Sequence, residues 1–353
     1  MATALGNVSL QNGSRTVTCF EKARNWVQEH PTTVKILKIA GLILGIGLLL
    51  SLPFASSSLG AVVAGGLAAV GATAIVASLL LFACHPKTAA SPVERPIADL
   101  WGELGQKTEV QEQGLEFLPA KDLNHRFANV FCPQKTAILV GERYLHANRV
   151  GEGIAQRSFV ATQAPLEQDY AIFWKAIFEN GSTIFDLTTI DDQTKNGVTK
   201  YYPDQLNETM KYGSMSVKLV EINDRTYTYQ IENTETRTVK NSKRYHYANW
   251  MDLSAVSLPI LRELVQAVET LSPDPKEPTW IHCRAGVGRT GTLITALVLK
   301  EKMKRGEISK ANLDASLVDV LIKLREQRGP IFVQTQQQLD LLRRYAESLM
   351  AVH

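Results

Sequence analysis

A thiol and a guanidinium stand six positions apart late in the chain, at Cys283 and Arg289. The five residues between them are mostly small: Arg284, Ala285, Gly286, Val287 and Gly288. Small residues let the backbone curl with its amides facing inward, and the apolar run that follows predicts a helix whose N-terminus faces the same space. A guanidinium can fork across two phosphate oxygens, and positive surroundings favour the thiolate form of cysteine. The segment therefore predicts a nucleophile beneath a phosphate-binding loop.

The elements that must position this loop are expected within residues 97–353, which have the composition of one globular domain. Apolar residues recur at helical spacing over 165–181, 253–272, 292–306, 311–329 and 336–351. Strand-like runs cover 182–188, 215–223, 227–233, 237–250 and 279–283, and three of them read as an antiparallel meander. Helices combined with a mixed sheet predict an α/β (α+β) fold, in which a twisted mixed central sheet is flanked by helices on both faces.

Composition excludes several classes of function. The 353 residues include 38 basic and 35 acidic side chains, so a net charge of +3 gives no bias toward nucleic acid. The four cysteines (Cys19, Cys84, Cys132 and Cys283) form no CxxC pair and no metal-ligand spacing. This pattern favours a reducing compartment with a free thiol, and we expect no disulfide framework, no metal site and no cofactor.

The region from Ile39 to Pro86 contains no Asp, Glu, Lys or Arg, and a segment with Pro and Ser divides it into two apolar lobes. Because a helix needs about 20 apolar residues to cross a bilayer, residues 34–84 predict a membrane-inserted helical hairpin. Lysines flank its entrance and exit, at Lys35, Lys38 and Lys87, so the positive-inside tendency places both of its ends in a cytosol. A buried helical pair in a soluble core is disfavoured, because a charge-free stretch leaves no side for solvent.

The hairpin divides the chain into four predicted parts. Residues 1–33 are polar and read as a flexible leader, and residues 34–84 form the hairpin. Residues 85–96 carry three prolines and read as a linker. Residues 97–353 then form the domain that contains the segment from Cys283 to Arg289, called the cysteine loop below. We therefore expect that domain to be anchored to a lipid bilayer.

The segment HCRAGVGRTG at 282–291 resembles the signature of cysteine-dependent protein tyrosine phosphatases. The similarity extends over most of residues 115–350 and includes YLHANRV at 144–150, FVATQAPL at 159–166 and TKYYPD at 199–204. The pattern NWMDLSAVS at 249–257 is most similar to effector phosphatases that pathogenic bacteria inject. This resemblance implies the tyrosine phosphatase fold and hydrolysis of phosphotyrosine in proteins through a phosphocysteine intermediate.

The same resemblance implies roles for the catalytic residues. Cys283 matches the nucleophile, Arg289 the phosphate-binding residue, and Asp252 the general acid and base. The segment 249–257 matches the mobile loop that carries this acid, called the acid loop below, and Trp250 matches its hinge anchor. Met251 replaces the proline expected in this loop and predicts looser or slower closure. His282 matches the residue that organises the loop, and Thr290 matches the hydroxyl that stabilises the leaving thiolate.

Further family segments imply the rest of the site. Gln334 and Gln338 in QTQQQL match residues that position the hydrolytic water. Asp191 matches an acidic residue that holds Arg289, with Asp192 as a rival. In NHRFANV, Phe127 matches the aromatic pocket wall, and Asn129 stands where an aspartate often contacts the substrate backbone.

Two other functions stay open at this point. The replacement at Met251 motivates a phosphotyrosine-binding pseudophosphatase, although Cys283, Arg289 and Asp252 are all present. The predicted membrane anchor motivates a dual-specificity or phosphoinositide phosphatase, but a lipid phosphatase would favour extra lysines where Ala285 and Val287 stand.

The polar leader and the two-lobed hairpin resemble inclusion membrane proteins of chlamydia-like intracellular bacteria. This resemblance implies a secreted effector whose catalytic domain faces the host cytosol from a pathogen-modified membrane.

Overall fold

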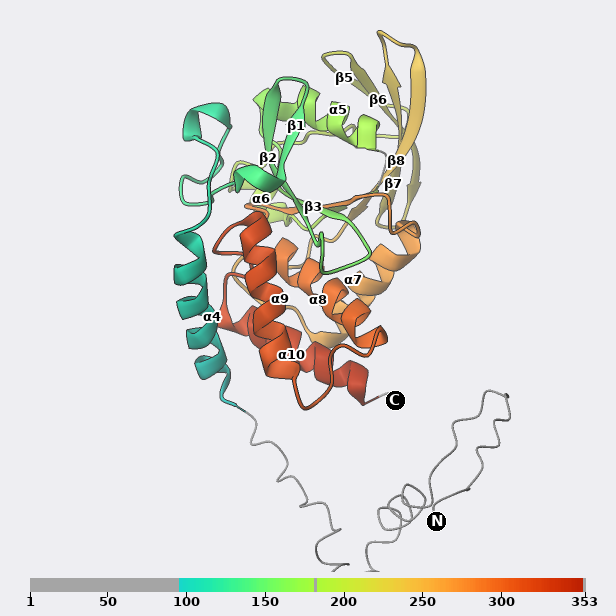
Figure 1. Cartoon of the computed structure of the whole chain (residues 1–353). Coiled ribbons are helices and arrows are strands. Elements are labelled where there is room, and N and C mark those ends of the chain that lie inside the picture. Colours follow the sequence, from blue (N-terminus) through green and yellow to red (C-terminus); the bar gives the residue numbers. More distant parts are fainter. Residues whose placement is uncertain (1–94, 181–182, 352–353) are drawn as a thin grey trace, which may run out of the picture. The chain divides into compact units, whose positions relative to one another are not determined.

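The computed structural model describes residues 95–180 and 183–351, in which a mixed sheet is flanked by helices (Figure 1). The strands of this part are β1 Ala137–Val140, β2 Arg143–Val150, β3 Phe159–Gln163, β4 Thr183–Asp186, β5 Thr209–Tyr212, β6 Met215–Asn223, β7 Thr226–Asn233, β8 Thr238–His246 and β9 Thr279–Cys283. They lie in the order β1-β2-β3-β9-β4-β8-β7-β6-β5. The central strands β3, β9, β4 and β8 run parallel, and the outer strands pair antiparallel.

The α-helices of the described part are α4 Ile97–Glu112, α5 Tyr170–Asn180, α6 Ile190–Thr194, α7 Leu258–Leu271, α8 Gly288–Lys304, α9 Leu313–Arg328 and α10 Gln336–Met350. Three 3₁₀ turns cover Ala120–Asp122, Gln134–Thr136 and Glu167–Asp169. Helices α4, α7, α8, α9 and α10 gather on one side of the sheet, and α5 lies on the other (Figure 1). Because α8 lies deepest in the larger core, every one of its residues from Gly288 to Leu299 is buried.

The structure confirms the predicted fold class, a mixed sheet between layers of helices, and the predicted meander appears as β6, β7 and β8. Three predicted helix starts are wrong by four or five residues. Helix α5 begins at Tyr170 instead of at 165, and a separate 3₁₀ turn covers Glu167–Asp169 before it. Helix α7 begins at Leu258 instead of at 253, because Ser257 has an extended backbone and a proline occupies the first turn. Helix α8 begins at Gly288 instead of at 292, so the cysteine loop runs directly into the helix N-terminus.

Helix α4 supports the loop that leads into α10. Its residues Leu100 and Leu104 are fully buried and pack in the larger core. The Thr108 hydroxyl accepts a hydrogen bond of 2.7 Å from Arg325, whose guanidinium also donates to the carbonyl oxygens of Phe332 and Val333. Burial lowers the pKa of Arg325 to about 10, so its charge persists near neutral pH. Helix α4 thereby helps to fix the backbone directly before Gln334.

The leader, the hairpin at 34–84 and nearly all of the linker lie outside the described residues, and these segments stay predictions. Across residues 95–180 and 183–351, no helix combines the length and the apolar character that crossing a membrane requires.

Candidate active site

The loop between β9 and α8 wraps around the sulfur of Cys283. The Gly286 N–H donates to Cys283 Sγ over 3.3 Å, which places an amide proton beside the thiol. Gly286 has a φ of +73°, and a Cβ built there would lie 2.1 Å from the carbonyl oxygen of Thr162. A side chain is therefore excluded both by the backbone conformation and by the neighbouring strand β3.

The carbonyl groups of this loop are turned away from the sulfur and toward Arg328. This fully buried guanidinium donates to the carbonyl oxygens of Gly286 (3.2 Å) and Ala285 (3.4 Å) and to Asn148 Oδ1 (3.0 Å). Because the C=O and N–H of a planar peptide point in opposite directions, outward carbonyls leave the amides facing inward. Inward amides in such a loop form a concavity of the kind that binds anions. Arg328 carried no signal in the sequence that links it to the cysteine loop.

Arg289 lies in the first turn of α8 and is fully buried. Its Nη1 donates to the carbonyl oxygens of Leu187 (3.0 Å) and Trp250 (3.1 Å), and its Nη2 donates to Asp252 Oδ1 (3.1 Å). Its Nε is buried and has no hydrogen-bond partner among the described residues. Since an unsatisfied buried donor costs about 1–3 kcal/mol, a phosphate oxygen that accepted from Nε would recover that free energy.

The acidic partner of Arg289 is Asp192, and the assignment of Asp191 to this role is wrong. Arg289 Nη1 lies 2.6 Å from Asp192 Oδ2, whereas the exposed Asp191 pairs with Lys195 at 2.9 Å. Successive residues of a helix point about 100° apart, and Thr189 caps α6 by a reciprocal hydrogen-bond pair with Asp192. The capping geometry turns Asp192 inward and leaves Asp191 in solvent.

The pKa of Asp192 follows from these contacts. Burial alone would raise the pKa, but the hydrogen bonds from Arg289 and Thr189 outweigh burial, and the pKa is lowered. The pKa of Arg289 shifts in the opposite direction. Burial alone would lower the pKa of Arg289, but the nearby Cys283 and the carboxylates of Asp192 and Asp252 outweigh burial and raise it. The guanidinium therefore stays charged.

The acid loop lies directly against Arg289. The indole N–H of the buried Trp250 donates to the carbonyl oxygen of Ser254, and the N–H and hydroxyl of Ser254 both donate to the carbonyl oxygen of Met251. These bonds close a turn around Asp252 and Leu253. Leu253 has a φ of +56°, which costs about 1–2 kcal/mol in a residue other than glycine. Met251 is 73% exposed, so most of its surface faces solvent.

Two glutamines, Gln334 just before α10 and Gln338 in its first turn, reach both loops. A Cβ built on Gly288 would lie 2.4 Å from Gln334 Oε1, so the Gln334 carboxamide rests against the cysteine loop. Gln338 is fully buried, accepts from the Gln334 N–H (2.9 Å) and donates to the Ser254 carbonyl oxygen (3.1 Å). The structure therefore places Gln338 as a link between the acid loop and Gln334.

The mouth of the site carries an aromatic side chain. Phe127 is half-buried, and the guanidinium of Arg284 lies 4.9 Å from the centre of its ring, within cation–π distance. The Ala164 N–H donates to the Arg284 carbonyl oxygen, which ties the cysteine loop to the end of β3. Asn129 is exposed two residues beyond Phe127.

His282 directly precedes Cys283, Thr290 directly follows Arg289, and both are fully buried. Tyr201 Oη lies 2.7 Å from His282 Nε2, and His282 Nδ1 lies 3.3 Å from the Cys283 carbonyl oxygen. Burial lowers the pKa of His282, so the ring is neutral near pH 7. The hydroxyl of Thr290 has no hydrogen-bond partner among the described residues.

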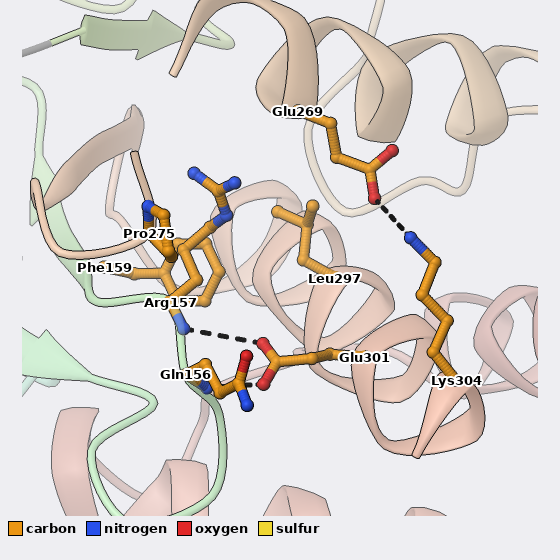
Figure 2. Close-up of a pocket in the computed structure, with 8 residues that line it drawn as sticks. All are labelled: Gln156, Arg157, Phe159, Glu269, Pro275, Leu297, Glu301 and Lys304. Carbon is orange, nitrogen blue, oxygen red and sulfur yellow. Dashed lines mark hydrogen bonds and ion pairs between the residues drawn. The ribbon is translucent and has the colours of Figure 1, made fainter. Parts of the chain in front are cut away.

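A separate pocket of about 220 Å³ opens at the other end of β3 and β9 (Figure 2). Phe159, at the start of β3, lines it, whereas the cysteine loop follows the far end of β9. The carboxylate of Glu301 accepts the backbone N–H groups of Gln156 and Arg157, and Glu269 pairs with Lys304 (Figure 2). These side chains hold neighbouring loops and helices together and do not take part in the site around Cys283.

Comparison with known proteins agrees with this geometry. A family model described as protein-tyrosine phosphatase matches residues 122–347. The receptor-type tyrosine-protein phosphatase S of Gallus gallus is 25% identical over 259 residues, which cover 68% of this chain and 16% of that protein. The tyrosine-protein phosphatase Lar of Drosophila melanogaster is 28% identical over 219 residues, which cover 58% of this chain and 10% of that protein. The chain thus spans only a small part of the length of these relatives.

Solved structures share the fold. One that reports the structural basis of PTPN18 fingerprint on distinct HER2 tyrosine phosphorylation sites has a TM-score of 0.63 at 21% identity, covering 73% of this chain and 95% of that chain. Another, of PTPN18 in complex with HER2-pY1196 phosphopeptides, has a TM-score of 0.61 at 21% identity, with coverages of 72% and 93%.

The relatives named here are animal phosphatases, so the resemblances to injected bacterial effectors and to inclusion membrane proteins stay predictions. The family model spans every strand of the described sheet and the loop that holds Cys283 and Arg289. On these grounds the chain belongs to the protein-tyrosine phosphatase family.

Proposed function

We propose that this protein hydrolyses phosphotyrosine in other proteins through a phosphocysteine intermediate. The observation that carries the proposal is the position of Arg289, which follows the inward-facing amides around Cys283 and donates directly to Asp252. A nucleophile, an anion site and a proton donor therefore meet around one loop.

In the first step, the thiolate of Cys283 attacks phosphorus, so that an S–P bond forms while the bond to the tyrosine oxygen breaks. Asp252 gives its proton to the leaving phenolate oxygen. Arg289 and the loop amides stabilise the negative charge on the remaining phosphoryl oxygens, and their positions are already fixed by Arg328 and Asp192.

In the second step, water attacks the phosphocysteine and Asp252 accepts a proton from that water. Gln334 orients the water from its place against Gly288, and Gln338 holds Gln334 and the acid loop together. The S–P bond breaks, inorganic phosphate leaves, and the Cys283 thiolate is restored. The hydroxyl of Thr290 stabilises that thiolate as it leaves phosphorus.

The shape of the mouth favours phosphotyrosine over phosphoserine. Phe127, backed by Arg284, gives the pocket an aromatic wall that a long phenyl phosphate can contact and a short phosphoserine cannot. The uncharged Ala285 and Val287 in the loop weigh against an inositol phosphate headgroup. The related PTPN18 structures concern tyrosine-phosphorylated sites of HER2, which supports the same substrate class.

We further propose that the hairpin at 34–84 anchors the protein in a membrane with both ends in a cytosol. The charge-free stretch from Ile39 to Pro86 supports this, and a bacterial effector in a pathogen-modified host membrane is the setting that the sequence resemblances favour. Alkaline extraction of membranes and epitope tagging test the proposal. Release of the full chain by alkaline carbonate would contradict the anchor.

The catalytic proposal is tested with the full chain in detergent, assayed on phosphotyrosine peptides, phosphoserine peptides and a soluble phosphoinositide. We expect turnover on phosphotyrosine alone and none in Cys283→Ser. The variant Asp252→Ala should lose about 10²–10⁴-fold in kcat while it still binds phosphopeptide. Tight binding without phosphate release by the wild-type protein would favour a pseudophosphatase, and equal rates on the phosphoinositide would favour a lipid enzyme.

A further inference from the structure

A buried carboxylate lies one strand away from the nucleophile, and none of the catalytic steps above uses it. Asp186 is the last residue of β4, and it is fully buried. In the sheet it stands opposite His282 on β9 and opposite His246 on β8. Asp186 is therefore level in the sheet with His282, the residue directly before Cys283.

The two oxygens of Asp186 have different partners. Oδ2 accepts from Arg244 Nη2 (2.6 Å) and Nε (3.0 Å), and this guanidinium is buried as well. Oδ1 accepts from the backbone N–H (2.9 Å) and the hydroxyl of Thr188. The same Oδ1 lies 3.7 Å from His282 Nε2. One side chain thus contacts β8, β9 and the turn that follows β4.

The backbone around Asp186 reaches both catalytic loops. The Tyr247 N–H, at the root of the acid loop, donates to the Asp186 carbonyl oxygen over 2.9 Å. The next residue, Leu187, receives Arg289 Nη1 on its carbonyl oxygen, and its N–H donates to the His282 carbonyl oxygen. Because the carboxylate fixes the turn at Thr188, it also fixes the carbonyl groups on which Arg289 and the acid loop depend.

Stability alone is a weak reason for this pair. A buried ion pair usually gains little over apolar residues of similar size, because both charges lose their hydration. Arg244 also stacks on the ring of Tyr202, with 3.6 Å between the guanidinium carbon and the ring centre. The ion pair between Asp186 and Arg244 is therefore well packed. It also lies near the ends of β4 and β8, where it can hold these two strand ends in register.

We propose that Asp186 is a positioning residue for the phosphatase reaction, and that it locks the ends of β4, β8 and β9 so that Arg289 presents the anion site in one fixed arrangement. The proposal rests on the proposed function for its catalytic consequence. Its binding consequence, the affinity of the loop for an oxyanion, can be measured without any turnover.

The experiment uses the full chain and two variants. Asp186→Asn leaves Arg244 buried without a matching charge, so it is expected to lose stability as well as function. The double variant Asp186→Asn with Arg244→Met removes both charges, and its melting temperature is expected to return close to that of the wild type. The double variant therefore separates positioning from stability.

Tungstate is the probe for the anion site, and its affinity is measured by calorimetry beside kcat and KM on a phosphotyrosine peptide. We expect the double variant to bind tungstate about 10-fold more weakly and to lose about 10-fold in kcat/KM, the equivalent of one lost hydrogen bond to a charged group. Recovery of tungstate affinity and kcat/KM together with the melting temperature would overturn the proposal.

A matched control is the ion pair between Arg343 and Asp314, which joins α10 to α9 at 3.0 Å. Asp314→Asn with Arg343→Met should change the melting temperature and leave tungstate affinity within about 2-fold. If the double variant at Asp186 does not fold, Asp186→Glu is measured instead, and wild-type tungstate affinity in that folded variant would overturn the proposal. If the proposed phosphatase function is wrong, the wild-type protein will bind tungstate but show no turnover. That result is distinct from the outcomes that would overturn the role of Asp186.

Discussion

Arg289 Nη1 lies 2.6 Å from Asp192 Oδ2, and that carboxylate also accepts the backbone N–H of Thr189 at the cap of α6. One oxygen atom therefore joins the Arg289 guanidinium, for which we propose phosphate binding, to the start of α6, which three residues separate from the end of β4. Asp192 thus holds Arg289 through Nη1, and Nε has no partner within residues 95–180 and 183–351, so it can serve as the proposed donor to substrate.

Asp192→Asn is expected to lower kcat/KM about 10- to 100-fold, because a hydrogen bond between charged groups contributes about 1.5–3 kcal/mol. Its neighbour offers a matched control. Asp191→Asn removes the same charge from an exposed pair with Lys195 and should leave kcat/KM within about 2-fold. Steady-state kinetics on a phosphotyrosine peptide measure both. Equal losses in the two variants would contradict the assignment of Asp192.

Met251→Pro is expected to raise kcat about 2- to 5-fold, because proline at a compatible position removes about 0.4–1 kcal/mol of conformational freedom from the open loop. Met251 is 73% exposed, and no backbone hydrogen bond donated by its N–H is seen within the described residues, so a proline ring would displace little. Met251→Ala is the control, since it shortens the side chain and leaves the backbone free. A kcat for the proline variant at or below that of the alanine variant would refute the prediction.

Gly286→Ala is expected to reduce kcat by at least about 100-fold, because a displacement of about 1 Å in a catalytic loop has that effect. The added Cβ would meet the Thr162 carbonyl oxygen, which belongs to a strand and cannot move aside. Gly102→Ala is the contrasting change. Gly102 is exposed within α4, a Cβ there meets nothing within 4 Å, and the variant should be more stable by about 0.5–1 kcal/mol in urea unfolding with unchanged kcat.

The free energy of unfolding is expected to fall as pH drops from about 6.5 toward 4. Burial lowers the pKa of His146 to about 3, and burial also lowers the pKa values of His246 and His282. A histidine whose pKa is lower in the folded state takes up a proton on unfolding, so its contribution is complete above pH 6.5 and is lost as pH falls toward the folded value. Each such proton gives a slope of about 1.4 kcal/mol per pH unit.

His146→Asn tests this directly. It removes one titrating group while keeping a donor near the Val130 carbonyl oxygen, which His146 Nε2 contacts at 2.9 Å. Urea unfolding between pH 7 and pH 4 should show a shallower decline for the variant than for the wild type. Parallel curves would show that His146 already titrates normally in the folded protein.

The sequence was sufficient where function depends on local spacing. Cys283 and Arg289 lie in one loop, so the strand before it, the glycines within it and the helix after it could be inferred from adjacent residues. Asp252 also carried a local signal in NWMDLSAVS, although only the structure shows its contact with Arg289. The fold class followed from the alternation of helical and strand-like patterns.

What could not be predicted depends on contacts between distant segments. The choice between Asp191 and Asp192 required the orientation of α6, which the Thr189 cap sets. Arg328 supports the loop from α9, and no local pattern distinguishes it from a surface arginine of an amphipathic helix. The short strands β1 and β3 have too few residues to show a clear period, so their place beside β9 was visible only in the sheet.

The insertion of β9 at the middle of the sheet has a consequence for how the protein matures. Its neighbours β3 and β4 are synthesised much earlier. Each of them pairs with β9, so the middle of the sheet can close only after β9 has been made. Such pairing between distant segments is the slow part of folding. A growing chain that has not yet released β9 and α8 from the ribosome has no loop that could bind phosphate. The proposed phosphate-binding loop around Cys283 therefore forms only when the sheet is complete.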